Sequence, residues 1–431
     1  MKISTKSIYK NKDFLLLFFG GFVSRVGNAV HFIGLTWFVL ELTGSGSATG
    51  IIMFFSTLPG VLIGPLGGVI VDRINRKLLI VGMDVIRGLI VIWLSWYIYT
   101  GAAGYFHLAL TTVLLAICGT LFNPAISATI PNLVKNKYLQ KANSMEHFSA
   151  NFTQVIGAAV GGILVSFLGI SGIFLINGIT FLVSGFSEMF INIPSVKREG
   201  KNGNNNDSNF IKELKFGAIY LYNNKPIFSL FTISIFLNFI ASGSMMVGLP
   251  YIFKEILSVS GKLYGIAQSI FPGGAFLGAI LLNFIPEIKN YYRVFVTTIG
   301  FEGLLFFIIG IPFLPIFINN YSILIIYYYI ISILFIGGMV NTLINVPLKV
   351  LLQRMIPDNL RGRVFGLLSS FSQGLVPISM ALTGFLFDLV PVYYIFMISG
   401  IMIIFMALII KKIEAIKKLN SNEEKTKCIT T

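Results

Sequence analysis

Long apolar stretches alternate with short polar breaks along almost the whole chain. Most stretches hold about 20 or more residues, which is the length an α-helix needs to cross the hydrocarbon core of a bilayer. The pattern predicts an all-α membrane protein with twelve transmembrane helices. We place them at residues 14–41, 47–71, 78–99, 105–130, 142–168, 172–193, 227–253, 262–285, 293–313, 322–346, 363–389 and 392–411.

The composition of the chain excludes a water-soluble protein. Of its 431 residues, 55% are hydrophobic and 11% are charged, and the mean hydropathy is +0.84. A water-exposed surface must carry more charge than this. The 40 Phe and 43 Gly fit a lipid-facing exterior and close contacts between helices.

The chain carries a net charge of +15, and its basic residues lie almost all on one predicted side of the membrane. Of the 32 Lys and Arg, 28 fall in the termini and in every second loop. Only Lys254 and Lys262 fall on the opposite side, and Arg25 and Arg87 lie inside predicted helices. Because positive residues gather in cytoplasmic loops, we expect both termini to be cytoplasmic. The basic charge therefore indicates topology and not a nucleic-acid footprint.

One long polar segment divides the chain into two halves of six helices. The division gives an N-terminal six-helix bundle (1–193), a cytoplasmic central linker (194–226), a C-terminal six-helix bundle (227–411) and a cytoplasmic tail (412–431). Each half also has a proline before a basic loop, Pro131 and Pro357, 226 residues apart. Two related six-helix halves are typical of transporters that alternate access to a central site.

Glycines recur four residues apart on three of the predicted helices. Such spacing lets two helix backbones approach closely. We expect these three helices to form close, sliding contacts. The glycines are Gly60, Gly64 and Gly68, then Gly157 and Gly161, and finally Gly274 and Gly278.

The break after the second apolar stretch combines one carboxylate with three cations. It holds Gly68, Asp72, Arg73, Asn75, Arg76 and Lys77. This run resembles the signature of the major facilitator superfamily between its second and third helices, with Asn75 where the family has glycine. Asn tolerates a left-handed backbone better than most residues, so we expect the turn to be kept.

A second set of residues resembles one branch of that superfamily, which holds macrolide efflux proteins and the enterobactin exporter. The set comprises Trp37, 42–45, 122–125, Ala128, 130–133, 142–144, Pro347, Gln353, Pro357 and 361–364. The resemblance covers nearly the whole chain. Residues 157–162 keep only part of the antiporter motif, because they lack its usual proline.

The resemblance implies that Asp72 meets the start of the eleventh helix and closes the cytoplasmic side. A carboxylate at a helix N-terminus gains about 0.3–1 kcal/mol, and nearby arginines would add charge pairing. An ordinary positively charged loop would explain the cations but not Asp72. The expected conformational latch comprises Gly68, Asp72, Arg73, Arg76, Lys77, Arg361 and Arg363.

Polar residues inside the predicted helices are candidates for a substrate cavity, because a charge within a span is costly. Arg25, Asn28 and His31 share an arc of about 120° on the first helix. In the superfamily that helix lines the central cavity with helices four, seven and ten. Those helices carry Asn123, Asn238, Asn341 and Asn345. Alternatively, Arg25 pairs with a neighbouring helix and is structural.

A proton carrier must be a carboxyl group or a histidine that can change its charge near neutral pH. The candidates are Glu41, Glu146 (with His147 beside it) and Glu302. Each has a plain alternative: solvation at a helix end for Glu41, anchoring for Glu146 and a structural partner for Glu302. Asp84 and Arg87, three residues apart, are expected to neutralise each other. Glu188 and Asp388 lie near helix ends and are weaker candidates.

The sequence contains no motif for catalysis, ATP or metal binding. There is no phosphate-binding Gly-Lys-Ser/Thr loop and no nucleophile elbow. The two cysteines, Cys118 and Cys428, have no metal spacing and no reason to form a disulfide. We therefore expect a protein that is not an enzyme and needs no cofactor or metal.

These observations together favour a proton-coupled exporter of macrolide-like or other amphipathic drugs in a bacterial plasma membrane. We expect it to act as a monomer within the lipid bilayer, with a small-molecule substrate. One alternative is a siderophore or metabolite exporter, which would use Arg25 to bind an anion; another is an importer or facilitator. From a different class, a non-transporting membrane scaffold or sensor would be indifferent to Asp72→Asn.

Overall fold

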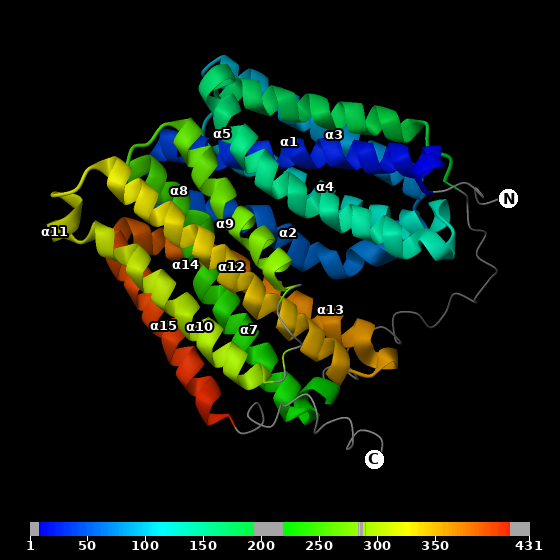
Figure 1. The fold of residues 1–431 in the computed structure, drawn as a ribbon. Helices are drawn as coiled ribbons and strands as arrows, with labels where there is room; N and C mark the ends of the chain where they lie inside the picture. The colour runs from blue at the N-terminus through cyan, green and yellow to red at the C-terminus, as the bar shows by residue number, and fades with distance from the viewer. Residues whose placement is uncertain (1–7, 194–218, 283, 285–287, 289, 414–431) are drawn as a thin grey trace, which may run out of the picture. The chain divides into compact units, whose positions relative to one another are not determined.

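The computed structural model describes residues 8–193, 219–282, 284, 288 and 290–413. Within these ranges the chain is nearly all helical (Figure 1). The longer α-helices are α1 (Lys12–Thr43), α2 (Gly46–Arg73), α3 (Arg76–Tyr99), α4 (Tyr105–Leu133), α5 (Asn136–Met189), α7 (Lys225–Gly243), α9 (Gly261–Leu282), α10 (Tyr291–Gly310), α12 (Ile323–Met355), α13 (Asp358–Gly374), α14 (Val376–Leu389) and α15 (Val392–Lys412). The short elements are η1 (Ile8–Lys10), η2 (Ser244–Gly248), α8 (Leu249–Tyr251), η3 (Ile252–Ile256), η4 (Ile311–Phe313) and α11 (Pro315–Ile318).

Eleven of the helices found among the described residues are long and apolar enough to cross a membrane. One of them, α5, has 54 residues and would be about 81 Å long if straight. That is far more than the roughly 30 Å of a bilayer core. Gly169 interrupts it with φ 67° and ψ −178°, a conformation that is essentially open only to glycine.

The contacts of α5 with α1 show that the chain reverses at Gly169. Before it, Gly157 lies against Ala29 and Gly161 against Ile33, so both helices run in the same direction. After it, the order is opposite: Gly34 lies against Phe174 and Gly20 against Ser187. α5 is therefore two membrane-spanning helices, and the predicted twelve spans are confirmed.

The chain separates into two compact units, the first of which comprises Met1–Lys197 and Pro250–Ser269. Small residues bring its helices together. Gly88 on α3 lies against Gly178 on α5, where an added Cβ would be 3.1 Å from the Gly178 carbonyl oxygen. Residues 250–269 belong to this unit as well, and within them Gly265 lies against Gly162. An added Cβ on Gly265 would be 2.9 Å from the Ala158 carbonyl oxygen.

The second unit comprises Arg198–Leu249 and Ile270–Thr431, and close glycine contacts hold it together as well. Gly278 on α9 lies against Met339 on α12, with 3.0 Å between an added Cβ and the Met339 Cα. Gly303 on α10 and Gly400 on α15 face each other, and an added Cβ on either would lie within 2.8 Å of the other's carbonyl oxygen. The predicted domain limits, including the linker at 194–226, stay predictions, because residues 194–218 lie outside the described ranges.

The expected glycine contacts hold for two of the three helices. Gly157 and Gly161 pack on α1, and Gly274 and Gly278 pack on α12. On α2, by contrast, an added Cβ on Gly64 would meet no described atom within 4 Å, and one on Gly60 would meet only Thr120, at 3.9 Å. The spacing of glycines alone does not tell which of them a neighbouring helix covers.

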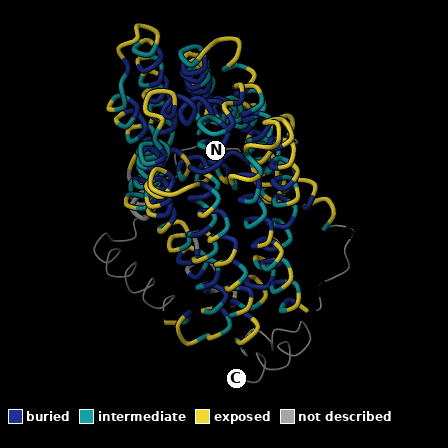
Figure 2. Tube along the Cα trace, turned by 90° about the vertical axis from the view of Figure 1, so that its left-hand side faces the viewer, coloured by how far each residue is buried: buried dark blue, intermediate teal, exposed yellow. Residues whose placement is uncertain are grey.

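Large apolar side chains are exposed along the outer helices, as a lipid environment requires. Trp96 on α3, Phe106 on α4 and Phe405 on α15 each expose at least 60% of their surface. Buried and exposed positions follow one another along the same helices (Figure 2). A soluble protein does not carry this much exposed aromatic surface.

Candidate functional site

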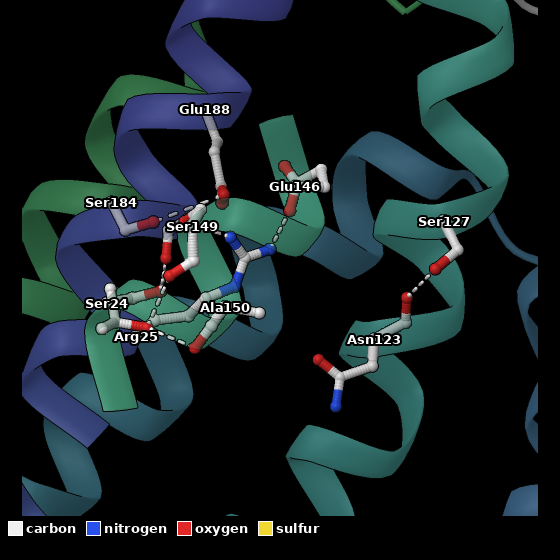
Figure 3. Close-up of polar contacts among 11 residues, drawn as sticks. Ser24, Arg25, Asn123, Ser127, Glu146, Ser149, Ala150, Ser184 and Glu188 are labelled. Atoms are coloured by element: carbon white, nitrogen blue, oxygen red, sulfur yellow. Dashed lines mark hydrogen bonds and ion pairs between the residues drawn. The ribbon is translucent and has the colours of Figure 1, made fainter. Parts of the chain in front are cut away.

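A charge pair between α1 and the part of α5 before Gly169, here called its first arm, is the centre of the polar site in the first unit. The part after Gly169 is the second arm. Arg25 forms an ion pair with Glu146, and its Nη1 donates a hydrogen bond to the Ser149 hydroxyl at 2.8 Å (Figure 3). The side chains expose 27% and 13% of their surface, so the pair is partly accessible. Glu146 and Ser149 are three residues apart and thus share one face of their helix.

Exposed amides and a hydroxyl lie on the helices beside this pair. Asn28 is exposed on α1, and Asn123 and Ser127 are exposed one turn apart on α4. The Ser127 hydroxyl donates to the Asn123 carbonyl oxygen at 3.1 Å. Figure 3 shows the Asn123 amide on the α4 ribbon across from Arg25 and Glu146. These groups offer both donors and acceptors to a ligand in the first unit.

His31 does not share this surface, in contrast to the expectation from its spacing. It is buried, and its ring packs edge-on against Phe174 on the second arm of α5, with 4.7 Å between ring centroids. The three residues span an arc of about 120° around α1, which is wide enough for His31 at one end to point into the protein interior while Asn28 is exposed. The structure thus leaves Arg25 and Asn28 as the accessible members of the predicted set.

Aromatic side chains lie on the same two helices as the charge pair. Phe148 and Phe152 stack on each other along α5, with 5.3 Å between ring centroids, and Phe152 also stacks on Phe22 of α1 at 6.3 Å. Phe148 and Phe152 are exposed. α1 and α5 thus carry both a charge pair and aromatic rings in this part of the unit.

The second unit contains a cavity of about 60 Å³ that is lined by α7, α10, α12 and α15. Its polar lining consists of four predicted residues, Asn238, Glu302, Asn341 and Asn345, together with Ser234. Ile233, Phe295 and Ile299 are among the apolar residues around them. This volume holds a few water molecules but not a drug-sized ligand.

A chain of amides leads from the exposed Asn345 to the buried Glu302. The Asn345 amide donates to the side-chain oxygen of Asn341 at 3.1 Å, and the Asn341 amide donates to the Glu302 carboxyl at 3.3 Å. Only 7% of Glu302 is exposed. Among the residues the structure describes, no cation forms an ion pair with Glu302.

Asn238 is held at the edge of the cavity by two hydrogen bonds. Its amide donates to the Ser234 carbonyl oxygen at 2.9 Å and to the Ser372 hydroxyl of α13 at 3.0 Å. The partner Ser372 was not singled out from the sequence, because it lies more than 130 residues away and no pattern links the two positions.

Glu41 lies at the opposite end of α1 from its N-terminus and is half exposed. It forms an ion pair of 3.5 Å with Lys254, which belongs to the same unit. The Lys254 ammonium group also lies 4.1 Å from the ring centroid of Trp37. A lysine between a carboxylate and an aromatic face is a stabilising arrangement for an exposed charge.

The loop that carries the predicted latch begins α3 in a different way from the expectation. Asn75 has φ −61° and ψ 114°, so it is not left-handed. Its side chain instead caps α3 by accepting hydrogen bonds from the backbone N–H groups of Lys77 and Leu78 at 3.0 and 3.4 Å. An Asn at this position satisfies the free N–H groups of the helix, which a glycine could not do.

Among the residues of the predicted latch, Arg76 forms a side-chain hydrogen bond to a neighbouring helix. Its Nη1 donates to the Ala128 carbonyl oxygen of α4 at 2.9 Å, while Lys77 is half-buried. The surroundings of Gly68 and the side chains of Asp72, Arg73, Arg361 and Arg363 lie outside what the structure describes. Their role as a latch therefore stays a prediction.

No group of three or more His, Cys, Asp or Glu in the described part of the chain could hold a metal ion. The two units instead present a partly exposed charge pair in one and a buried carboxyl in a small polar cavity in the other. Such groups can bind a polar ligand and a proton, respectively. They include no nucleophile that is paired with a base.

Comparison with known proteins gives one family. The model of the Major Facilitator Superfamily matches residues 17–373 and, again, residues 231–427. Macrolide efflux protein A of Streptococcus pyogenes is 25% identical over 414 residues, which cover 94% of this chain and 97% of that protein. The MFS-type transporter YvqJ of Bacillus subtilis is 24% identical over 385 residues, or 89% of this chain and 87% of that one.

A solved structure shares the fold over its full length. The bacterial homologue of the iron transporter ferroportin, in its inward-facing state, superposes with a TM-score of 0.72. The superposition covers 95% of this chain and 100% of that one at 18% sequence identity. At that identity the likeness concerns the fold alone.

Proposed function

Because the chain belongs to the Major Facilitator Superfamily, we propose that it exports amphipathic, macrolide-like compounds from bacteria in exchange for protons. It is a multi-pass membrane transporter and not an enzyme. The observation that carries the proposal is the partly exposed Arg25–Glu146 pair on two helices that also carry stacked, exposed aromatic rings in the first unit. The likeness to Macrolide efflux protein A over 94% of the chain supports the same substrate class.

The substrate surface that we propose joins two kinds of contact. Phe148 and Phe152 offer an apolar face, whereas Asn28 and Asn123 offer amides that can both donate and accept hydrogen bonds. Arg25 is already neutralised by Glu146. The surface therefore suits an amphipathic compound with many hydroxyl and carbonyl groups better than a highly charged anion such as a catechol siderophore.

Among the three candidate carboxyls, Glu302 is the one that we propose to carry the coupling proton. Protonation of Glu146 would break its ion pair with Arg25, and Glu41 pairs with Lys254 at the exposed end of α1. Glu302 instead lines a cavity that can hold water and accepts a hydrogen bond from an uncharged amide. It can take up and release a proton without separating an ion pair.

Alternating access requires that one side closes while the other opens. We propose that Asp72 with Arg361 and Arg363 closes the side that the charge pattern predicts to be cytoplasmic. The resemblance of residues 68–77 to the family signature supports this assignment. The plasma membrane, with both termini in the cytoplasm, is the location that the distribution of basic residues favours.

The test is the accumulation of a radiolabelled macrolide in bacteria that produce the protein, with and without a protonophore. We expect lower accumulation than in cells with an empty vector, and we expect the protonophore to abolish the difference. Glu302→Gln should remove the protonophore-sensitive part, whereas Glu41→Gln, as the matched control, should keep it. Equal accumulation in producing and empty-vector cells would exclude macrolides as substrates. Export by Glu302→Gln at the wild-type rate would exclude Glu302 as the proton carrier.

A further inference from the structure

Three ionisable side chains meet in the interior of the first unit. Asp84 and Arg87 lie on α3, and Glu188 lies near the end of α5. Each exposes between 0% and 4% of its surface. The sequence predicted the pair on α3 but gave no reason to join Glu188 to it, because the contact depends on how the second arm of α5 packs.

The packing of α3 on α5 brings the three groups together. Asp84 Oδ1 lies 3.2 Å from Arg87 Nη2. An added Cβ on Gly185, three residues before Glu188, would lie 3.4 Å from the Asp84 Cβ, so the two helices touch at this level. The Ser184 hydroxyl donates to Glu188 Oε1 at 3.3 Å and also neighbours Asp84.

Aromatic rings and helices close this cluster from other sides. The Arg87 guanidinium lies 4.0 Å from the ring centroid of Phe122 on α4 and 4.9 Å from that of Phe181 on α5. Within the described residues, neither oxygen of Asp84 nor Oε2 of Glu188 has a hydrogen-bond partner. The ion pair with Arg87 and the hydrogen bond from Ser184 thus leave some carboxyl oxygens of this buried cluster without a hydrogen bond from the protein.

The charges of the cluster do not balance. Two carboxylates and one guanidinium leave one negative charge in the buried interior of the unit, which is a costly arrangement. The other ionisable group that faces the cluster is the Cys118 thiol on α4. From α1, Gly20 approaches Ser184, while Arg25 on the same helix is paired with Glu146. No second cation that could balance the charge faces the cluster among the described residues.

We propose that Asp84 and Glu188 form a proton-binding site that holds one proton beside Arg87. The proton bonds to a carboxyl oxygen of one of the two residues, and the other carboxyl stays ionised and paired with the guanidinium. The cluster as a whole is then neutral. A protonated carboxyl also gains a donor, which can satisfy one of the orphaned oxygens across the cluster. This site is independent of the substrate and of Glu302.

The direct measurement is infrared spectroscopy of the purified protein in D2O at neutral pH, which resolves the carbonyl stretch of a protonated carboxyl group. We expect Glu188→Gln and Asp84→Asn each to remove one such band, because the remaining carboxyl then forms a simple ion pair with Arg87. Glu302→Gln is the matched control, since it removes a buried carboxyl from the other unit and should leave this band in place. Persistence of the band in both single variants would overturn the proposal.

Thermal unfolding gives a second readout that does not depend on the spectrum. Each single variant keeps a neutral cluster and should melt close to the wild-type temperature. The double variant Asp84→Asn/Glu188→Gln leaves Arg87 without a counter-charge, so its melting temperature should fall by much more than the sum of the two single shifts. Additive shifts would refute the shared proton, because the effect of each substitution would then not depend on the other carboxyl.

Discussion

The ion pair between Arg25 and Glu146 should be energetically coupled, and much more strongly than the exposed pair between Glu41 and Lys254. The perturbation is a double-mutant cycle with Arg25→Met and Glu146→Gln. Two unit charges about 4 Å apart attract each other by about 4 kcal/mol at an effective dielectric constant of 20. The side chains of the pair expose 27% and 13% of their surface, so solvent screening reduces this value. We expect a coupling energy of about 2 kcal/mol, which is in the range of hydrogen bonds to charged groups.

The control cycle uses Glu41→Gln and Lys254→Met in the same unit. The two side chains expose 50% and 21% of their surface, and their charged atoms are 3.5 Å apart. Pairs of this kind contribute about 0.2–1 kcal/mol, because water screens them and their side chains lose entropy. Both cycles connect α1 to a second segment, so the main difference between them is exposure.

The assay follows unfolding through the reaction of a thiol probe with Cys118, which is buried in the native protein. A Cys428→Ser background removes the other thiol of the chain. Glu146→Gln should unfold at lower denaturant than wild type, because Arg25 then lacks its counter-charge, and the double variant should recover part of that loss. Equal coupling energies in the two cycles would refute the argument from exposure.

Two further predictions concern the backbone. Gly400→Ala should destabilise the protein by about 1–3 kcal/mol relative to Gly82→Ala, because its Cβ would lie 2.6 Å from the Gly303 oxygen, whereas that of Gly82 meets no described atom within 4 Å. Alanine gains the same helix propensity in both variants, so this gain cancels when their melting temperatures are compared. Equal melting temperatures would contradict the close contact of α10 and α15. Gly169→Ala should cost about 1–3 kcal/mol through backbone strain alone, since its φ is 67° and a Cβ there meets no described atom within 4 Å. A melting temperature for Gly169→Ala equal to that of Gly82→Ala would show that the chain reverses at another residue.

The hydrophobic pattern predicted the number of spans and nearly all of their limits, because a bilayer imposes the same length and apolar character on every helix that crosses it. The second span illustrates this point: its predicted limits of 47–71 differ from those of α2 by only one or two residues. Even the break between the fifth and sixth spans, predicted at 169–171, includes Gly169, the residue with non-helical backbone angles inside α5. Local propensity and membrane thickness were sufficient for these features.

The partners of the polar residues could not be predicted in the same way. Arg25 was identified from its cost inside a span, but its pairing with Glu146 joins positions 121 residues apart. His31 and Asn28 belong to one helical face in sequence, yet one is buried against Phe174 and the other is exposed. Which face of a helix meets another helix depends on packing between distant segments, and a single sequence does not record it.

The sequence by itself therefore determined the class of the protein, its spans and the list of residues able to carry charge inside the membrane. Only the tertiary structure decided how those residues combine: Arg25 with Glu146, Glu302 with Asn341, and Glu188 with Asp84 and Arg87. The physical reason is that the bilayer acts on each helix separately, through its length and hydrophobicity. The energy of a buried charge, in contrast, depends on the nearest opposite charge or amide, which another helix supplies.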